Sequence, residues 1–292
     1  SLCGAIVARH AAPDLAAEIL PQVVSGDAVI ALALTEPKGG SDAAALALKA
    51  TRDCDSYILD GEKTSISMAD QADHAVVFAR TGTPEEKARG ISAFLVDLAL
   101  PGISRTRFND LGEHAIGRGS LFFDQVRVPA SHLLGSEGSG FVQVMQGFDF
   151  SRALIGLQCL AIARVSLAET WAYVKERKAF GRPLADHQGV TFPLAEAETM
   201  VEAARLLCYR TLAAKDAGVP HTKEAAMCKW WAPKLAFEVV QTCLLLHGHA
   251  GYSTELPFEQ RLRDVLGLQI GDGTAQIMKT IIAREALKSV AA

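Results

Sequence analysis

The sequence predicts an α+β protein in which a small antiparallel β domain is followed by a four-helix bundle. Two observations carry this prediction. Between residue 28 and about residue 135, short apolar runs are separated by turn signals, which is typical of strands. From about residue 140, apolar residues recur with the period of an α-helix over much longer stretches. The length of 292 residues is sufficient for a substantial hydrophobic core.

The first 27 residues have a helical pattern of their own. They open SLCGAIVARHAAPDLAAEIL, without a Met and already amphipathic. We therefore expect residues 1–27 to be the remnant of an N-terminal helical domain of a longer protein. Residues 28–135 are expected to form a middle β domain, and residues 136–292 a C-terminal helical bundle.

The predicted strands follow one another closely, as AVIALAL, SYILDGEKTSIS, HAVVFAR, ISAFLVD and LFFDQVRVP. Asp60-Gly61 suits a tight hairpin turn, and Pro101-Gly102 and Pro129 are further chain breakers. The short, regular spacing of these runs favours a barrel or a sandwich.

Four long helices are predicted after residue 140. The first carries an apolar stripe to Val174 and is closed by Gly181 and Pro183. The second covers roughly residues 190–216 and stops at AGVP.

The third helix begins after Thr222, a predicted N-cap, and reaches the HGHAG turn. Pro233 is expected to kink or break it. The fourth runs from Thr274 to Leu287. Because the breaks between these helices are short, a bundle is the natural packing.

Composition excludes several classes of protein. The net charge is −4, from 29 basic and 33 acidic residues without a basic run, so no nucleic-acid partner is predicted. None of the six cysteines forms a CxxC pair, which favours buried thiols in a reducing compartment, and we expect a cytoplasmic location. Gln158 and Arg164 interrupt the most apolar run, so no membrane span is predicted.

The stretch QIGDGTAQIM, residues 269–278, holds one carboxylate, Asp272, between two glycines and among apolar neighbours. One interpretation is a turn-former that precedes Thr274, the predicted N-cap of the last helix. The other is a base, since burial raises the pKa of a carboxyl and suits it to proton abstraction. The residues alone leave both interpretations open.

Two segments have the composition of ligand-binding loops. In ALTEPKGGSD, residues 33–42, the glycines permit close approach of a flat ligand, although a plain surface turn is the favoured interpretation of this stretch alone. In ERKAFGRPLADHQ, residues 176–188, Arg177 has the fork shape that suits a phosphate, with Phe180 beside a ring. Cations that complement a helix C-terminus explain this second segment equally well.

Two further motifs flank the predicted helices. FDFSR, residues 148–152, opens the longest predicted helix, where Asp149 either favours the helix dipole or joins Arg152 in binding a ligand. HGHAGY, residues 247–252, has histidines whose spacing points them in different directions on a helix. No metal site is therefore predicted, and a glycine-rich turn or helix C-cap is favoured.

Taken together, four stretches resemble the acyl-CoA dehydrogenases, a family of flavoproteins. They are LTEPxxGSD, RxxFGxxLxxHQ, HGxxGY and xGTAQIxxxIIAR, in this order and over nearly the whole chain. The resemblance implies an acyl-CoA dehydrogenase-like fold and FAD as cofactor. The positions that would contact FAD are Leu34, Thr35, Ser41, Ser67, Arg177, Phe180, Leu184, His187, Gln188, Gly248, Thr274 and Gln276.

By the same resemblance, the segment from Arg177 to Gln188 would reach the FAD of a neighbouring subunit. The positions that would bind the acyl-CoA are Ser41, Asp149, Arg152 and Gly273. An electron-transfer flavoprotein as electron acceptor and a homotetramer are implied as partners, with no membrane.

The sequence also departs from the family pattern. Ser65 stands where many members have Trp, Leu245 where Gln is common and His249 where a second Gly is common. Asp272 stands where most members have the catalytic Glu. The resemblance implies that Asp272 removes the α proton of an acyl-CoA while the β hydride passes to flavin N5, giving an enoyl-CoA.

An Asp base is one methylene shorter than Glu, so it favours a differently shaped acyl group. The alicyclic branch of the family, which acts on cyclohexane- or cyclohexene-carboxyl-CoA, resembles this chain in its Asp base and in GEKTSIS. Two alternative functions stay open. A flavin oxidase of the nitroalkane oxidase type also uses Asp, but Asp149 and Arg152 in a CoA-binding register argue against it. A non-catalytic FAD-binding subunit need not keep a carboxylate at position 272.

Overall fold

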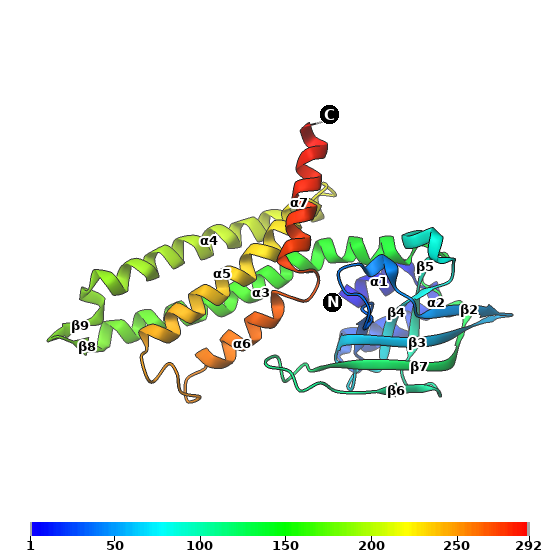
Figure 1. Cartoon of the computed structure of the whole chain (residues 1–292), viewed down its shortest axis with the longest axis horizontal. Helices are drawn as coiled ribbons and strands as arrows, with labels where there is room; N and C mark the ends of the chain where they lie inside the picture. Colours follow the sequence, from blue (N-terminus) through cyan, green and yellow to red (C-terminus); the bar gives the residue numbers. More distant parts are fainter. Residues whose placement is uncertain (1, 291–292) are drawn as a thin grey trace. The chain divides into compact units, whose positions relative to one another are not determined.

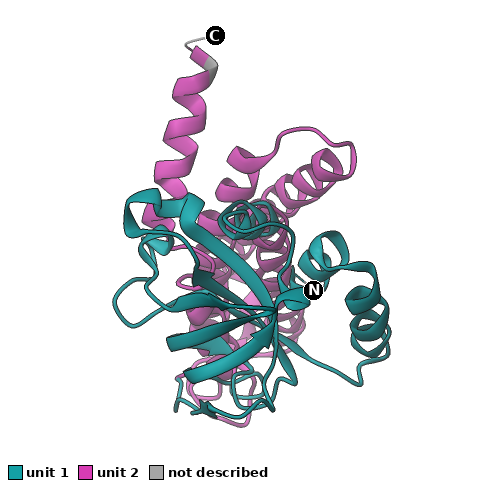
Figure 2. Cartoon of the chain, turned by 90° about the vertical axis from the view of Figure 1, so that its right-hand side faces the viewer, with its two compact units in different colours: residues 1–110, 114–148 teal, residues 111–113, 149–292 magenta. Residues whose placement is uncertain are grey.

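The computed structural model describes residues 2–290, and the chain divides into two compact units (Figure 2). Unit 1 comprises residues 1–110 and 114–148, and unit 2 comprises residues 111–113 and 149–292. The expected fold class is confirmed, because a β-rich region is followed by a helical region.

Unit 1 is built on a seven-stranded sheet. Its strands are β1 (Ile30–Ala33), β2 (Lys49–Asp53), β3 (Ser56–Ser67), β4 (His74–Arg80), β5 (Ile91–Asp97), β6 (Ile103–Arg105) and β7 (Arg118–Pro129). The order is β1-β4-β2-β3-β7-β6, with β5 also paired to β4. In Figure 1, β3, β7 and β6 are seen side by side in this order. Most pairs are antiparallel, whereas β1 and β2 each pair with β4 in parallel.

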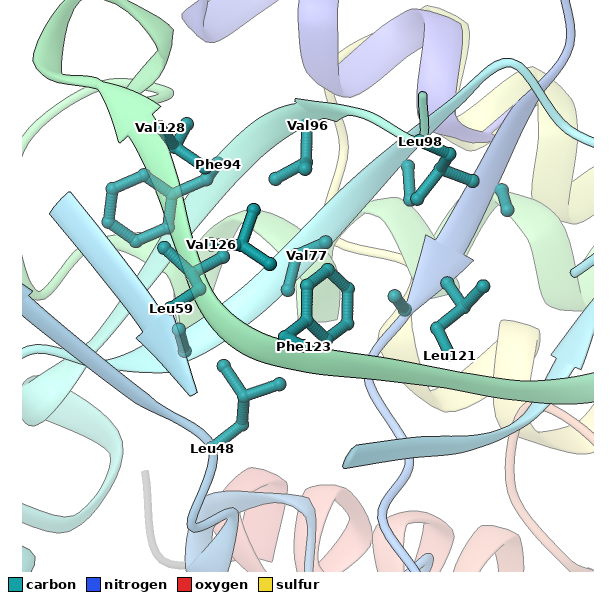
Figure 3. Packing of buried hydrophobic residues seen from close by; sticks show 14 of the residues in the cluster. Leu48, Leu59, Val77, Phe94, Val96, Leu98, Leu121, Phe123, Val126 and Val128 are labelled. Carbon is teal, nitrogen blue, oxygen red and sulfur yellow. The ribbon is translucent and has the colours of Figure 1, made fainter. Parts of the chain in front are cut away.

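The two faces of this sheet bury two different cores because side chains alternate along a strand. On one face Val77 of β4 packs with Phe94 and Val96 of β5 (Figure 3). On the other face, Val76 and Phe78 belong to the cluster that receives the two N-terminal helices, α1 (Leu2–His10) and α2 (Pro13–Ser25).

Through this cluster, α1 and α2 pack with the sheet inside unit 1. The compact units therefore differ from the three segments expected from the sequence, and the division into residues 1–27, 28–135 and 136–292 stays a prediction. Short 3-10 helices complete the connections, as η1 (Ala43–Ala45), η2 (Pro84–Gly90), η3 (Ala130–His132) and, in unit 2, η4 (Leu184–Asp186).

The predicted hairpin turn at Asp60-Gly61 is wrong. Both residues lie inside β3, and Gly61 adopts φ 138° where the register against β7 shifts. A Cβ at Gly61 would lie 3.1 Å from the Cα of Leu48, so the glycine permits close approach inside the sheet. The turn between β2 and β3 is formed instead by Cys54-Asp55, with Cys54 at φ 53°.

Unit 2 is helical. Its helices are α3 (Gly140–Glu176, which enters the unit at Asp149), α4 (Gln188–Asp216), α5 (Thr222–Leu246), α6 (Phe258–Leu268) and α7 (Ala275–Val290). A two-stranded hairpin, β8 (Lys178–Ala179) and β9 (Arg182–Pro183), joins α3 to α4. In Figure 1, α3, α4 and α5 run alongside one another and share one hydrophobic core, which α6 also enters. The short helix α6 was not among the four that the sequence predicted.

The helix α5 continues through the buried Pro233 without a break, whereas the alternative of a kink stays a prediction. Two predictions about helix ends are wrong, and the first concerns α5. Its N-cap is His221 rather than Thr222, and the Thr222 hydroxyl bonds Asp149 instead. The segment FDFSR does not open a helix, because α3 begins at Gly140.

All six cysteines are free thiols, five of them buried and Cys54 exposed. Among the described helices, α3 alone is long and apolar enough to cross a membrane by length and composition. Its buried residues, such as Leu160 and Leu167, belong to the hydrophobic core of unit 2. We therefore interpret α3 as a core helix.

Candidate functional site

The loop between α6 and α7 presents Asp272 in an unusual backbone conformation. Asp272 has φ 55° and Gly273 has φ 104°, so two successive residues lie in the left-handed region. A non-glycine residue is uncommon there and is kept in place by its surroundings. The hydroxyl of Thr274 accepts a hydrogen bond of 3.5 Å from the amide of Ile277, which confirms it as the N-cap of α7.

The carboxylate of Asp272 is half-buried and has one hydroxyl partner. The Ser151 hydroxyl donates to its Oδ2 at 3.0 Å. Burial raises the pKa of Asp272, against the opposing effects of the Ser151 hydrogen bond and of the positive charges on Lys229 and Arg152. The result is a carboxyl group whose ionised form is less stabilised than in water, as a general base requires.

Asp149 and Arg152, two predicted substrate residues, form a buried network close to this loop. Arg152 Nη1 lies 3.1 Å from Asp149 Oδ1, and Arg152 Nε donates to the Asp272 carbonyl at 3.4 Å. The second carboxylate oxygen of Asp149 accepts a 2.5 Å hydrogen bond from Thr222. These contacts hold the start of α5 and the loop that carries Asp272 against α3.

Lys229 is a residue that the sequence analysis missed. Its side chain is buried in α5, and its ammonium donates to the carbonyl of Leu268 at 2.8 Å and to that of Gly273 at 3.2 Å. Burial lowers the pKa of Lys229 to about 8, which the charge of Asp272 opposes. The available signal was a lone lysine on the apolar face of a helix, since Ala225, Ala232 and other residues of that face are buried.

In unit 1, the predicted cofactor loop after β1 is fixed by a buried ion pair. Lys63 donates to Glu36 at 2.7 Å and to the carbonyl of Leu34 at 3.0 Å. The Glu36 carboxylate also accepts the amides of Ala47 at 2.6 Å and Leu48 at 2.9 Å. Burial lowers the pKa of Lys63 to about 8, although Glu36 acts in the opposite direction. The sequence analysis missed both members of this pair.

The side chains of this region that were predicted to contact FAD differ in exposure. Leu34 is buried, Thr35 is half-buried, and Ser41 and Ser67 are exposed. Ser65, where many members of the family have Trp, is exposed at φ 58°. Within the described part of the chain, the structure shows no side-chain hydrogen bond for Thr35, Ser41 or Ser67.

In unit 2, the predicted cofactor segment forms the β8–β9 hairpin and the start of α4. Phe180, at its tip, is 97% exposed with φ 53°, and Arg177 is also exposed. His187 packs edge-on against Phe180 with ring centroids 6.2 Å apart and accepts a 3.2 Å hydrogen bond from Arg182. The amide of Leu184 bonds the carbonyl of Arg177 at 2.7 Å and closes the hairpin.

The remaining predicted positions are Gln188 at the start of α4, Gly248 after α5 and Gln276 in α7, all exposed. Gly248 adopts φ 61°, and the HGHAGY segment is a helix end as expected. The ring of His247 lies 4.2 Å from that of Tyr173 and 4.4 Å from that of Phe258. Among residues 2–290, no group of three or more His, Cys, Asp or Glu side chains could hold a metal ion.

Comparison with known families decides the class of this protein. Residues 31–126 match the acyl-CoA dehydrogenase middle domain, and residues 138–287 match the acyl-CoA dehydrogenase C-terminal domain. The chain belongs to the acyl-CoA dehydrogenase family. It is therefore an oxidoreductase of a flavoprotein family, as its motifs indicated.

Individual relatives in the acyl-CoA dehydrogenase family carry different activities. The cyclohexane-1-carbonyl-CoA dehydrogenase of Geobacter metallireducens is 37% identical over 279 residues, 95% of this chain and 73% of that protein. A subunit of the caffeyl-CoA reductase–Etf complex of Acetobacterium woodii is 34% identical over 293 residues, 99% of this chain and 76% of that subunit. The butyryl-CoA dehydrogenase structure from Megasphaera elsdenii superposes with a TM-score of 0.95 at 33% identity, covering 98% of this chain and 75% of that one.

Proposed function

We propose that this protein dehydrogenates the Cα–Cβ bond of an acyl-CoA thioester and that Asp272 removes the α proton. The observation that carries the proposal is the Asp272 carboxylate, half-buried on a left-handed loop with a raised pKa. A thioester carbonyl acidifies its α hydrogen, so a carboxylate with a raised pKa is a competent acceptor for that proton.

The side chains of this chain fit FAD. Thr35, Ser41 and Ser67 have hydroxyls for the polar edge of a ring, and the glycines after Pro37 leave room for it, since a Cβ at Gly40 would meet only Thr35. Arg177 and Phe180 are exposed, as is required of residues that contact a cofactor of a neighbouring subunit. FAD, when bound, supplies the hydride acceptor of the reaction.

The residues around Asp272 orient the base. Ser151 donates a hydrogen bond to Oδ2 of Asp272. This bond restricts rotation of the carboxylate and therefore also fixes the position of Oδ1. Arg152, paired with Asp149, binds the backbone carbonyl of the base and contributes a positive charge. Because burial outweighs these contacts, proton uptake by Asp272 is more favourable than for a carboxylate in water.

The proposed substrate is an alicyclic carboxyl-CoA. Two arguments support it: the shorter Asp at the base position, and the similarity to the cyclohexane-1-carbonyl-CoA dehydrogenase of G. metallireducens. Identity alone does not select this substrate, because the similarity to the butyryl-CoA dehydrogenase of M. elsdenii is nearly as high. The side chain at position 272 is therefore the stronger of the two arguments.

The proposed electron partner is an electron-transfer flavoprotein, and the proposed assembly is a homotetramer. The first is supported by the relative that is a subunit of a caffeyl-CoA reductase–Etf complex. That same relative favours a second candidate function, reduction of an enoyl-CoA. In that direction a protonated Asp272 returns its proton to the α carbon, and its raised pKa favours the protonated form.

An anaerobic titration of the FAD-loaded protein tests the proposal. Cyclohexanecarboxyl-CoA, butyryl-CoA and octanoyl-CoA are added in turn, and the absorbance of the flavin is followed. Asp272→Asn is expected to keep its FAD and to lose reduction by every acyl-CoA, whereas Asp216→Asn, exposed at the end of α4, behaves as wild type.

Undiminished reduction of the Asp272→Asn variant contradicts the assigned base. Reduction of the wild type by the ring substrate alone supports the alicyclic class, and reduction by a straight chain rejects it while keeping the mechanism. Reduction by a nitroalkane with peroxide formation in air identifies an oxidase instead. A flavin that only an enoyl-CoA reoxidises identifies a reductase.

A further inference from the structure

The ammonium of Lys229 is a buried positive charge that forms no close ion pair. Only 1% of the residue is exposed, and among the described residues no carboxylate oxygen lies within 4.0 Å of it, although Asp272 is near enough for its charge to act on Lys229. Burying a charge in this way is unfavourable unless hydrogen bonds compensate it. The contacts that compensate it therefore indicate what the residue does.

Both hydrogen bonds of Lys229 go to the backbone of the base loop. Leu268 is the last residue of α6, where helix carbonyls lack partners within the helix and the helix dipole favours a cation. Gly273 directly follows Asp272. Residues 269–272 lie between these two carbonyls in the chain. The Lys229 side chain therefore bridges the end of α6 and Gly273, the residue that follows Asp272.

This bridge supports a backbone conformation that the loop does not favour by itself. Asp272 is at φ 55° between Gly271 and Gly273, the residue type with the largest conformational freedom. Without the ammonium, the start of the loop keeps its backbone hydrogen bonds to α6, since the amides of Ile270 and Gly271 donate to Gly267. Asp272 itself keeps the Ser151 hydrogen bond to its carboxylate and the longer one from Arg152 to its carbonyl.

We propose that Lys229 is a positioning residue that fixes the loop carrying Asp272. Its importance for catalysis rests on the proposed function of Asp272, whereas the bridge between Leu268 and Gly273 can be tested without any substrate. The charged groups that face Asp272 in unit 2 are Arg152 from α3, itself paired with Asp149, and Lys229 from α5.

The first measurement is hydrogen exchange of the full chain, followed on peptides that cover residues 266–278. Lys229→Met keeps the apolar length and removes the donors, and Lys229→Gln keeps one amide donor group. We expect faster exchange across residues 269–274 in Lys229→Met and an intermediate rate in Lys229→Gln. Lys234→Met, at an exposed lysine five residues further along α5, serves as the matched control and leaves the exchange unchanged.

The second measurement is the rate of flavin reduction in the FAD-loaded variants at saturating acyl-CoA. A displaced base lowers this rate about 10- to 100-fold in Lys229→Met, with the affinity for acyl-CoA retained and part of the rate restored in Lys229→Gln. The acid limb of the pH profile moves to higher pH, because removing a positive charge beside Asp272 raises the pKa of its carboxyl.

Unchanged exchange of residues 269–274 in both Lys229 variants overturns the proposal. Faster exchange together with an unchanged rate of flavin reduction and an unchanged pH profile also overturns it. In that case Lys229 stabilises the loop but does not affect the reactivity of Asp272. Failure of the proposed function is recognised separately, by full flavin reduction in Asp272→Asn. If Lys229→Met does not fold, the Lys229→Gln variant decides.

Discussion

The buried pair of Lys63 and Glu36 gives the sharpest test of how unit 1 holds its predicted cofactor loop. The side chain of Lys63 is 0% exposed and that of Glu36 is 9% exposed, and their charged atoms lie 2.7 Å apart. The perturbation is Lys63→Met, which keeps an apolar side chain of similar length. It leaves the Glu36 carboxylate buried with two backbone amides and removes the donor to the Leu34 carbonyl.

Removing one partner of a buried ion pair costs about 3–5 kcal/mol, because the other charge stays buried without compensation. The two amides that still bond Glu36 place the expected loss toward the lower end of that range, at about 3 kcal/mol. The double variant Lys63→Met with Glu36→Gln removes both charges. Its loss is expected to be smaller than the sum of the two single losses by about 1–3 kcal/mol.

The assay needs a probe in unit 1, because Trp171, Trp230 and Trp231 all lie in unit 2. Hydrogen exchange of peptides from β3 and β4 in rising urea reports the free energy of opening of the sheet. Lys49→Met, exposed on β2, is the control. A loss below about 1 kcal/mol for Lys63→Met refutes the reasoning, since Glu36 is then satisfied without the ammonium.

Three further predictions concern the proposed site. Arg177→Ala is expected to weaken FAD binding about 10- to 100-fold in a fluorescence titration, since it removes a charged hydrogen-bond donor. An affinity equal to that of Lys175→Ala, an exposed control, contradicts the proposed contact between Arg177 and FAD. The rate of flavin reduction is expected to fall as pH falls through the pKa of Asp272, which burial places above the ordinary 3.8, because the base must be ionised. Because the pKa of Asp272 is higher in the folded than in the unfolded protein, ionisation of Asp272 lowers the free energy of unfolding. This loss is absent below pH 3.8 and is complete above the pKa of the folded state. Asp272→Asn should therefore unfold at higher urea than wild type at neutral pH, and lower stability there contradicts the sign.

Several predictions from the sequence held because they depend on local pattern. Alternating apolar residues in HAVVFAR and ISAFLVD became β4 and β5, and the long apolar stripe became α3. The motif segments also identified the family. Thr274 was correctly expected to cap the last helix, because an N-cap depends on residues within one turn of it.

The predictions that failed depend on partners far away in the chain. Asp60-Gly61 has the composition of a hairpin turn, but Gly61 serves the close approach of Leu48 inside the sheet. Thr222 is a residue type that often caps helices, but its hydroxyl donates its hydrogen bond to Asp149 on α3. In both cases a tertiary contact, which cannot be read from the sequence, overrides the local preference of the residue.

The sequence by itself determined the fold class and the family, and it singled out Asp272 as the proposed base. The tertiary structure alone decided which polar side chains are buried and what they bond. Lys63 reaches a carbonyl 29 residues away, and Lys229 reaches one 44 residues away. The physical reason is that hydrophobic period and turn chemistry act within a few residues, whereas the desolvation of a charge and its compensation are set by whichever elements the fold brings together.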